Sequence, residues 1–291
     1  MSNKKFVIVT DSGCDMPTEF YKKNEIEVIK LGFTMDNINY EGDCGEQIDE
    51  KTFYNKLREG RMPTTYQITA EMVKNRLQPL LKEGNDVLVV AFSSGLSGTA
   101  DSFALCAKEL QKAYPKRKIC VVDSLCASMG EGLLLHYAIQ KAETGASVEE
   151  TAVYLEKIKK QICHYFTVDN LFHLKRGGRV SSATAFIGTL LKIKPIMRVD
   201  DHGKLEVIGK SVGRKKALSI VVSYLFDGWN GEEKDPVFIS HGDCLEDAEF
   251  VKSMILQRFP KTKITINYIG PVIGSHSGCG TLAIFFKGEK R

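Results

Sequence analysis

The stretch DVLVVAFSSGLSGTADSFALCAKELQKA, residues 86–113, decides the fold class of this chain. The run Asp86–Phe92, apolar after its first residue, is typical of a strand buried on both faces of a sheet. A turn rich in glycine and serine, Ser93–Gly98, follows, and Thr99–Ala113 then carries apolar residues at helical spacing. A strand, a tight turn and a helix in this order predict one unit of a parallel α/β sheet.

The same rhythm extends through the first half of the 291-residue chain. Phe6–Val9 and Ile119–Val122 resemble buried strands, and Gly130–Ala142 and Val148–Ile162 have helical patterns. We therefore predict a Rossmann-like N-terminal domain, residues 1–162, with a mostly parallel sheet. Because the chain exceeds the usual size of one hydrophobic core, we expect a second α/β domain over residues 163–291.

The second half mixes strands and helices in a different order. A strand-like run over 163–169 opens it, and an Asp- and Gly-containing turn at 200–203 predicts a β-hairpin between two apolar strands. We expect strands at 193–199, 204–209, 237–241, 263–269 and 281–287, and helices at 170–174, 184–191, 215–225 and 245–259. The overall prediction is a two-domain α/β fold.

Composition excludes several classes of protein. The net charge of +4 is too small, and its basic residues too scattered among acids, to indicate nucleic-acid binding. No apolar run reaches membrane-spanning length, and a strand-like segment begins too early for a signal peptide, so we expect a cytoplasmic protein without stable membrane insertion. The eight cysteines have neither CxxC nor zinc spacing, which predicts mostly structural thiols and no metal site.

The turn Ser93–Gly98 is the strongest candidate for a binding site. Glycines allow a ligand to approach the backbone, and the following helix begins with free N–H groups that favour a negative charge. A simple helix cap needs one hydroxyl, whereas this segment offers Ser93, Ser94, Ser97 and Thr99. The GxxxxGK[ST] signature of a P-loop is absent. We therefore favour a carboxylate or phosphate site here over a plain cap.

Three further segments carry polar groups that suit the same anion. Thr64 and Thr65 follow Pro63, although such a segment alone is most often a loop that enters a helix. His276 lies in a glycine-dense stretch, 270–280, which we interpret as a turn region between two strands, and a structural histidine is the simpler alternative. The basic turn with Arg176 and Arg179 suits a phosphate or an acidic partner, or is a solvated surface turn.

The chain lacks recognisable catalytic motifs. GxSxG, HExxH and a Walker lysine are all absent, and the hydroxyls have no adjacent base in the sequence. This absence favours a binding protein over an enzyme. Two alternatives stay open: a hydrolase or transferase of acyl or phosphoryl groups that uses Ser94 and His276, and a sensor of a small anion.

Taken together, these segments resemble the DegV family, the fatty-acid-binding subunits of bacterial fatty acid kinase. The resemblance covers essentially the whole chain. It is carried by these segments: Val9–Ser12, Pro63–Thr65 with Gln67, Ser93–Thr99, Val122–Ser124, Leu174–Ser181, Gly188–Pro195, and Gly270–Val272 with His276.

The resemblance implies that a long-chain fatty acid, such as palmitate or oleate, binds between two domains without any other cofactor. Its carboxylate would meet Thr64 or Thr65, Ser93 or Ser94, and His276, while its tail occupies an apolar tunnel mainly in the second domain. Burying a sixteen-carbon tail would contribute roughly 10 kcal/mol before ordering costs, at about 0.8 kcal/mol per CH₂. The protein would present the carboxylate to a separate kinase, which makes an acyl phosphate for phospholipid synthesis.

Two positions depart from the family pattern. Tyr66 replaces a smaller residue beside the expected carboxylate site. Val212 stands where relatives often carry an arginine, and Arg214 follows two residues later. We expect Arg176, Arg179 and Arg214 to be the candidates for contact with a partner or a phosphate.

Overall fold

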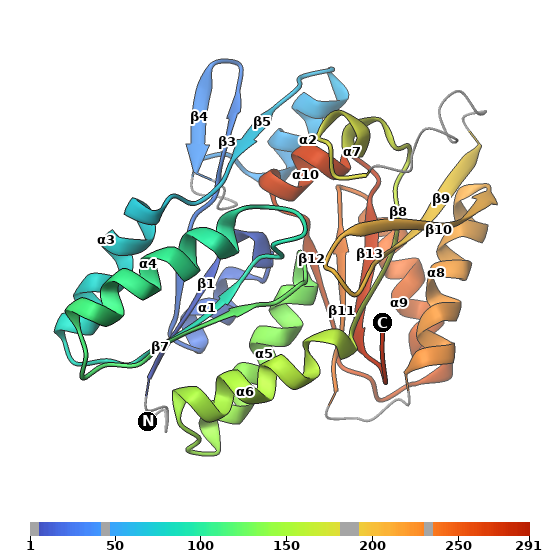
Figure 1. Ribbon diagram of the computed structural model, residues 1–291. Coiled ribbons are helices and arrows are strands. Elements are labelled where there is room, and N and C mark those ends of the chain that lie inside the picture. The colour runs from blue at the N-terminus through green and yellow to red at the C-terminus, as the bar shows by residue number, and fades with distance from the viewer. Residues whose placement is uncertain (1–5, 42–46, 181–191, 230–234) are drawn as a thin grey trace.

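A computed structural model describes residues 6–41, 47–180, 192–229 and 235–291 (Figure 1). The N-terminal half contains a four-stranded sheet in the order β2-β1-β6-β7, and all three strand pairs are parallel. Its strands are β1 (Val7–Asp11), β2 (Ile26–Ile29), β6 (Val87–Ala91) and β7 (Ile119–Asp123). β6 is fully buried, and its residues alternate between two cores on opposite faces of the sheet. The predicted parallel sheet is confirmed.

Helices cover both faces of this first sheet. α3 (Ala70–Lys82) and α4 (Thr99–Ala113) contribute to the core on one face, and α5 (Met129–Glu143) and α6 (Val148–Ile158) to the core on the other. α1 (Thr18–Lys23) packs beside β2, and the short 3₁₀ helices η1 (Ser12–Cys14) and η2 (Lys159–Gln161) complete this half. α4 has the predicted bounds, whereas α6 ends four residues earlier than expected and passes into η2.

A small antiparallel sheet, β4-β3-β5, was not expected. It consists of β3 (Gly32–Met35), β4 (Ile38–Glu41) and β5 (Thr64–Tyr66), and α2 (Glu50–Arg58) lies between β4 and β5 in the chain. In Figure 1 it stands apart from the two larger sheets, beside α2, α7 and α10. The segment predicted as a loop at Thr64 and Thr65 is therefore a strand whose register is fixed against β3.

The second half forms a six-stranded mixed sheet in the order β10-β9-β8-β13-β11-β12, in which only β11 and β12 pair in parallel. Its strands are β8 (Ile162–Thr167), β9 (Ile193–Val199), β10 (Leu205–Val212), β11 (Val237–His241), β12 (Ile264–Tyr268) and β13 (Leu282–Lys287). α8 (Arg214–Gly228) and α9 (Leu245–Arg258) pack on one face. The predicted hairpin is confirmed as β9 and β10, with a bulge between Val207 and Gly209.

Two further helices shape the region where the sheets meet. α7 (Phe172–Arg176) contacts α10 (Pro271–Ser277). The turn predicted for the glycine-dense stretch around His276 is therefore wrong: the stretch is helical from Pro271, a residue suited to a first helical turn. Gly274 allows this helix to pack closely on α2, because a Cβ there would lie 2.8 Å from the Tyr54 hydroxyl. The helix predicted at 184–191 lies outside the described residues.

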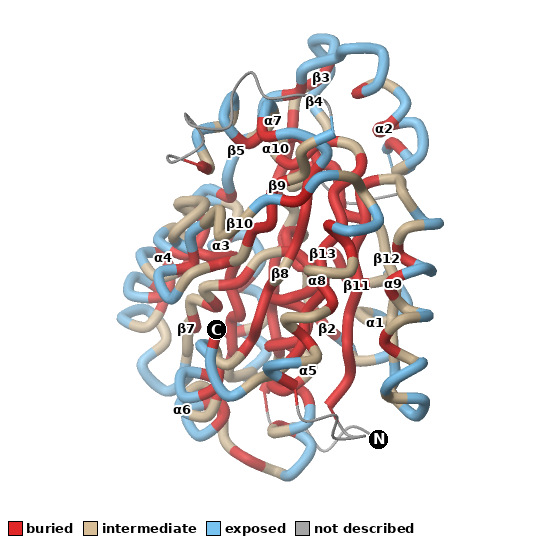
Figure 2. Tube along the Cα trace, turned by 90° about the vertical axis from the view of Figure 1, so that its right-hand side faces the viewer, coloured by how far each residue is buried: buried red, intermediate tan, exposed pale blue. Residues whose placement is uncertain are grey.

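α5 lies between the two large sheets. It contacts β6 on one side and β8, β11 and β13 on the other, and eleven of its fifteen residues are buried. One hydrophobic cluster accordingly contains residues of both sheets, such as Leu88 and Phe285. Figure 2 shows buried segments running without interruption through the centre of the molecule. The second sheet begins next to the predicted boundary at residue 162, but the division into two domains stays a prediction.

Candidate functional site

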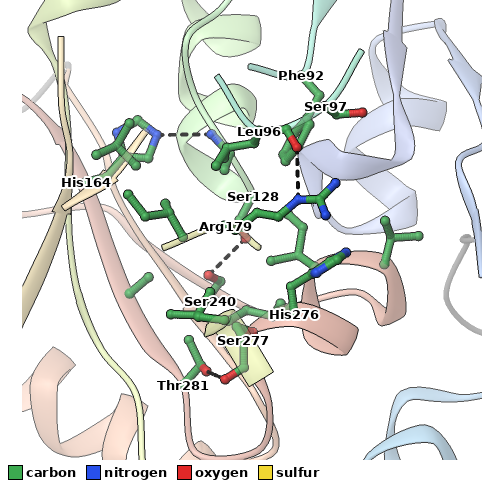
Figure 3. Close-up of a pocket in the computed structure, with 18 of the residues that line it drawn as sticks. Phe92, Leu96, Ser97, Ser128, His164, Arg179, Ser240, His276, Ser277 and Thr281 are labelled. Carbon is green, nitrogen blue, oxygen red and sulfur yellow. Dashed lines mark hydrogen bonds between the residues drawn. The ribbon is translucent and has the colours of Figure 1, made fainter. Parts of the chain in front are cut away.

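A cavity of about 420 Å³ lies in the region where the two sheets meet. This volume falls in the usual range for pockets that hold small molecules. Its apolar side chains come from both halves of the chain: Leu31, Phe92, Leu96, Ala127, Phe166, Leu174, Val199, Leu205, Ile269, Val272, Ile273, Ala283 and Phe285. Among its described lining residues, Arg179 is the one cation and there is no carboxylate (Figure 3). Such a cavity suits a mostly apolar ligand with one negative group.

Thr65 and His276 meet at the wall of this cavity. The Thr65 Oγ1 lies 2.7 Å from the His276 Nε2, although the two residues are 211 positions apart in the chain. Both line the cavity, whereas Thr64 is exposed. The reason is strand geometry, since neighbouring side chains on β5 point to opposite faces. Of the two threonines expected to contact an anion, the structure brings only Thr65 to the cavity.

The His276 imidazole is held in a neutral state. Its pKa is lowered to about 4, chiefly by burial and further by the nearby charges of Arg179 and Arg176 and by His173. Its Nδ1 is buried with no hydrogen-bond partner among the described residues. A Cβ on Gly177 would overlap this Nδ1, so the glycine makes room for the ring. At neutral pH His276 therefore offers a hydrogen-bonding imidazole without a formal charge.

The two arginines of the basic turn have different positions. Arg179 lines the cavity, where its Nε donates to the Leu96 carbonyl at 3.1 Å (Figure 3). Its guanidinium also donates to the Gly177 carbonyl. Arg176 instead donates to the carbonyls of Pro63, at 2.9 Å, and Ser275, at 3.2 Å. Arg176 thus ties β5 to α10, and Arg179 supplies the charge at the cavity.

The serines of the Ser93–Gly98 turn also differ in whether they line the cavity. Ser93 is fully buried and donates to the Gly203 carbonyl at 2.8 Å, which joins this turn to the β9–β10 hairpin. Ser94 is exposed, and its backbone N–H donates to Asp123. Neither belongs to the residues that line the cavity; Ser97 does, with its Oγ 3.0 Å from the Thr99 Oγ1. Ser97 was part of the recognised motif, but nothing in the sequence distinguished it from its neighbours.

Arg214 lies away from the cavity lining. Its Nε donates to the Asp247 Oδ2 at 2.9 Å, and its guanidinium also pairs with Asp169 at 3.7 Å. Val212, at the end of β10, is 67% exposed. The structure therefore does not bring Arg214 together with Arg176 and Arg179.

Tyr66, expected beside the carboxylate site, lines the cavity, and so does Gln67, which was not predicted as a site residue. Tyr66 is 41% exposed, covers Gly32, and donates its hydroxyl to the Tyr40 carbonyl at 3.1 Å. Tyr66 therefore adjoins the cavity while its ring packs on Gly32 and stays partly exposed. None of the helices in the described ranges combines the length and apolarity needed to cross a bilayer.

The fold and the site define an α/β protein in which two sheets enclose an apolar cavity of ligand size. The family model described as "uncharacterised protein, DegV family" matches residues 5–289. A DegV domain-containing protein of Clostridium perfringens is 44% identical over 288 residues, which is 99% of each chain. The chain therefore belongs to the DegV family, as its sequence motifs predicted.

Solved structures of relatives have the same fold. A DegV lipid-binding protein from Thermotoga maritima is 30% identical with a TM-score of 0.86 and covers 99% of each chain. A DegV family protein from Thermus thermophilus, described by its fatty acid binding, is 30% identical with a TM-score of 0.87, over 98% of this chain and 99% of that one. DegV of Bacillus subtilis, a fatty acid binding protein, is 31% identical with a TM-score of 0.84, over 98% of this chain and the whole of that one.

Proposed function

We propose that this chain binds a long-chain fatty acid, palmitate or oleate in type, in the cavity between its two sheets, and acts by binding rather than by catalysis. The observation that carries the proposal is the asymmetry of the cavity: apolar walls with one cation and no carboxylate among the described lining residues. A fatty acid has the matching asymmetry, with one anionic end and an apolar tail. The fatty acid binding named for relatives with the same fold supports it.

The carboxylate would lie beside Arg179, Thr65 and His276. Arg179 would supply the attractive charge, and the Thr65 hydroxyl would accept from the neutral imidazole and donate its own hydrogen to the carboxylate. Ser97 would take the place expected of Ser93 or Ser94, because it lines the cavity and they do not. Thr64 would have no direct part. Burial of the tail would supply most of the affinity, and these polar groups would set its orientation.

The direct test is native mass spectrometry of the protein purified from cells. We expect a bound mass that matches a long-chain fatty acid, or uptake of palmitate or oleate by protein stripped of lipid. An Arg179→Gln variant should bind more weakly, while Arg214→Gln, with its guanidinium outside the cavity lining, serves as the matched control. A purified protein that is empty and takes up neither acid would refute the proposal.

The finer proposal is that the protein presents the bound carboxylate to a separate fatty acid kinase. The closeness of the proposed carboxylate site to the partly exposed Tyr66 supports it, since a kinase has to reach that end of the ligand. The loaded protein with ATP should form an acyl phosphate only after a fatty acid kinase catalytic subunit is added. Tight fatty acid binding without any acyl phosphate under these conditions would contradict the kinase role alone.

The two alternatives receive less support. A hydrolase or transferase would need Ser94 close to His276, yet Ser94 is exposed and lies outside the cavity that His276 lines. A sensor of a small anion would suit a closed polar pocket, whereas thirteen apolar residues line this one. Binding of a long-chain fatty acid therefore fits the geometry of the cavity better than either of these two functions.

A further inference from the structure

A second polar group lines the cavity. It consists of Ser128, at the start of α5, Ser240 on β11 and His164 on β8 (Figure 3). All three side chains are more than nine-tenths buried, with relative exposures of 5%, 0% and 2%. Polar groups at such depth need hydrogen-bond partners, so their presence along an apolar cavity calls for a specific explanation.

His164 presents an acceptor. Its Nδ1 lies 2.9 Å from the Ile162 carbonyl, which can only accept, so the ring hydrogen is on Nδ1. The Nε2 therefore carries a lone pair, and its one partner among the described residues is the Ala127 N–H at a long 3.3 Å. Gly130 leaves space for this ring, because a Cβ there would overlap the Nε2. Burial and the charge of Arg291 hold the pKa of His164 well below its usual range, so the ring stays neutral.

The two serines form a hydrogen-bonded chain that starts at a buried carboxyl. The Ser128 Oγ lies 2.6 Å from the Asp15 Oδ2 and 3.0 Å from the Ser240 Oγ, while the Asp15 Oδ1 accepts from the Gly270 N–H. If Asp15 is ionised, both serine hydrogens point toward it and Ser240 is left as an acceptor. If Asp15 is protonated, the chain reverses and Ser240 is left with a spare hydrogen. A ligand hydroxyl, which both donates and accepts, matches either arrangement.

Strand register places this polar group along the tail of the proposed ligand, not at its head. Thr281, Ala283 and Phe285 line the cavity in alternate positions leading away from α10, which carries His276. Ser240 pairs with Ala283 and His164 with Phe285. At about 3.3 Å per strand residue, Ser240 lies roughly 7 Å and His164 roughly 13 Å beyond Thr281.

We propose that the cavity takes a fatty acid that carries a hydroxyl group along its chain, and that Ser240 binds this hydroxyl. The proposal rests on the proposed function, which supplies the fatty acid and its orientation. A second carboxylate is disfavoured along this wall, because it would lie near Asp15 at Ser240 or face the lone pair of the imidazole at His164. A plain methylene chain would leave the Ser240 hydroxyl with Ser128 as its one side-chain partner among the described residues, and its remaining hydrogen-bonding capacity unused.

The experiment compares three octadecanoic acids: one without a hydroxyl, one with a hydroxyl in the middle of the chain, and one with a hydroxyl next to the carboxylate. Their affinities for lipid-free protein are measured by displacement of a fluorescent fatty acid. One satisfied hydrogen bond should make the mid-chain acid bind on the order of threefold to tenfold more tightly than the plain acid. Equal or weaker binding of the mid-chain acid, or equal gain from a hydroxyl near the carboxylate, would overturn the inference.

Two variants assign the effect to the polar group. Ser240→Ala should bring the affinities of the plain and mid-chain acids together. Ser211→Ala removes a serine that is 4% exposed and lies outside the cavity lining, and should keep the preference. If none of the three acids binds, the proposed function itself fails. If the plain acid binds and the mid-chain acid gains nothing, only the present inference fails.

Discussion

A substitution at Gly177 tests whether packing against α7 positions His276. Gly177 has helical backbone angles, φ −76° and ψ −6°, so alanine is compatible with its conformation. Its Cβ, however, would overlap the His276 Nδ1 and lie 3.0 Å from the Cε1. Because interiors are close-packed, the ring would have to shift by roughly 1 Å, which would also disturb its contact with the Thr65 hydroxyl. Gly177→Ala should therefore weaken both folding and ligand binding.

The magnitude follows from two opposing effects. Overpacking of this kind lowers the free energy of unfolding by about 1–3 kcal/mol. Alanine also reduces the backbone entropy of the unfolded chain, which raises the free energy of unfolding by about 0.4–1 kcal/mol. We expect Gly177→Ala to lower the free energy of unfolding by about 1–2 kcal/mol. In a His276→Ala background the clash is gone, and the same substitution should stabilise the protein by about 0.4–1 kcal/mol.

Gly178→Ala is the matched control. Gly178 has φ +71°, and no atom of the described residues lies within 4 Å of the position that a Cβ would take. Alanine there therefore costs about 1–2 kcal/mol through backbone conformation alone, and this cost should be the same with and without His276. Urea unfolding of the single and double variants measures all four values. A Gly177→Ala cost that persists in the His276→Ala background would refute the reasoning.

Three further outcomes are expected. Thr65→Val should weaken binding of palmitate about tenfold by loss of one hydrogen bond to the carboxylate, and Thr64→Val should leave the affinity unchanged. Equal losses of affinity in the two variants would contradict the assignment of Thr65 to the cavity face of β5. Burial raises the pKa of Asp15 to about 7, so between about pH 4 and pH 7 the folded chain holds a proton that the unfolded chain has lost. The free energy of unfolding should therefore fall as pH rises through this window, by a few kcal/mol at most. Asp15→Asn should reduce this dependence on pH, and an unchanged dependence would count against a raised pKa of Asp15. Ser93→Ala should lower the free energy of unfolding by about 1–3 kcal/mol, because the hairpin carbonyl loses its buried donor, while Ser94→Ala should stay within about 0.5 kcal/mol in the same unfolding assay.

The parallel sheet and the hairpin could be predicted because their signals are local. Buried strands such as β6 are continuous apolar runs, and the turn at 200–203 has the composition of a hairpin connection. The β4-β3-β5 sheet has strands of three or four residues, and β5 is largely exposed, so no apolar run marks it. α10 has three small residues among seven and little helix propensity, and its close packing through Gly274 on Phe53 and Tyr54 is not visible in the sequence.

The candidate site was predictable only where a motif marked it. Thr65 and His276 lie in recognisable segments, and the structure brings them together. Within the serine-rich turn the sequence cannot tell which hydroxyl reaches the cavity, because that depends on how the turn meets the hairpin at Gly203. Ser240 and His164 lie on strands with no motif around them, and strand pairing alone aligns them along the cavity.

The position of α5 has a consequence for how the chain can be divided. A fragment that ends before β8 would keep this helix but lose the sheet that covers its second face, so a row of apolar side chains would meet water. A fragment that begins at β8 would expose the complementary surface. We therefore expect neither fragment to fold stably on its own. Loss of either half removes the support of the other, so the molecule should melt in a single cooperative step, and circular permutants or split versions need both pieces present to fold.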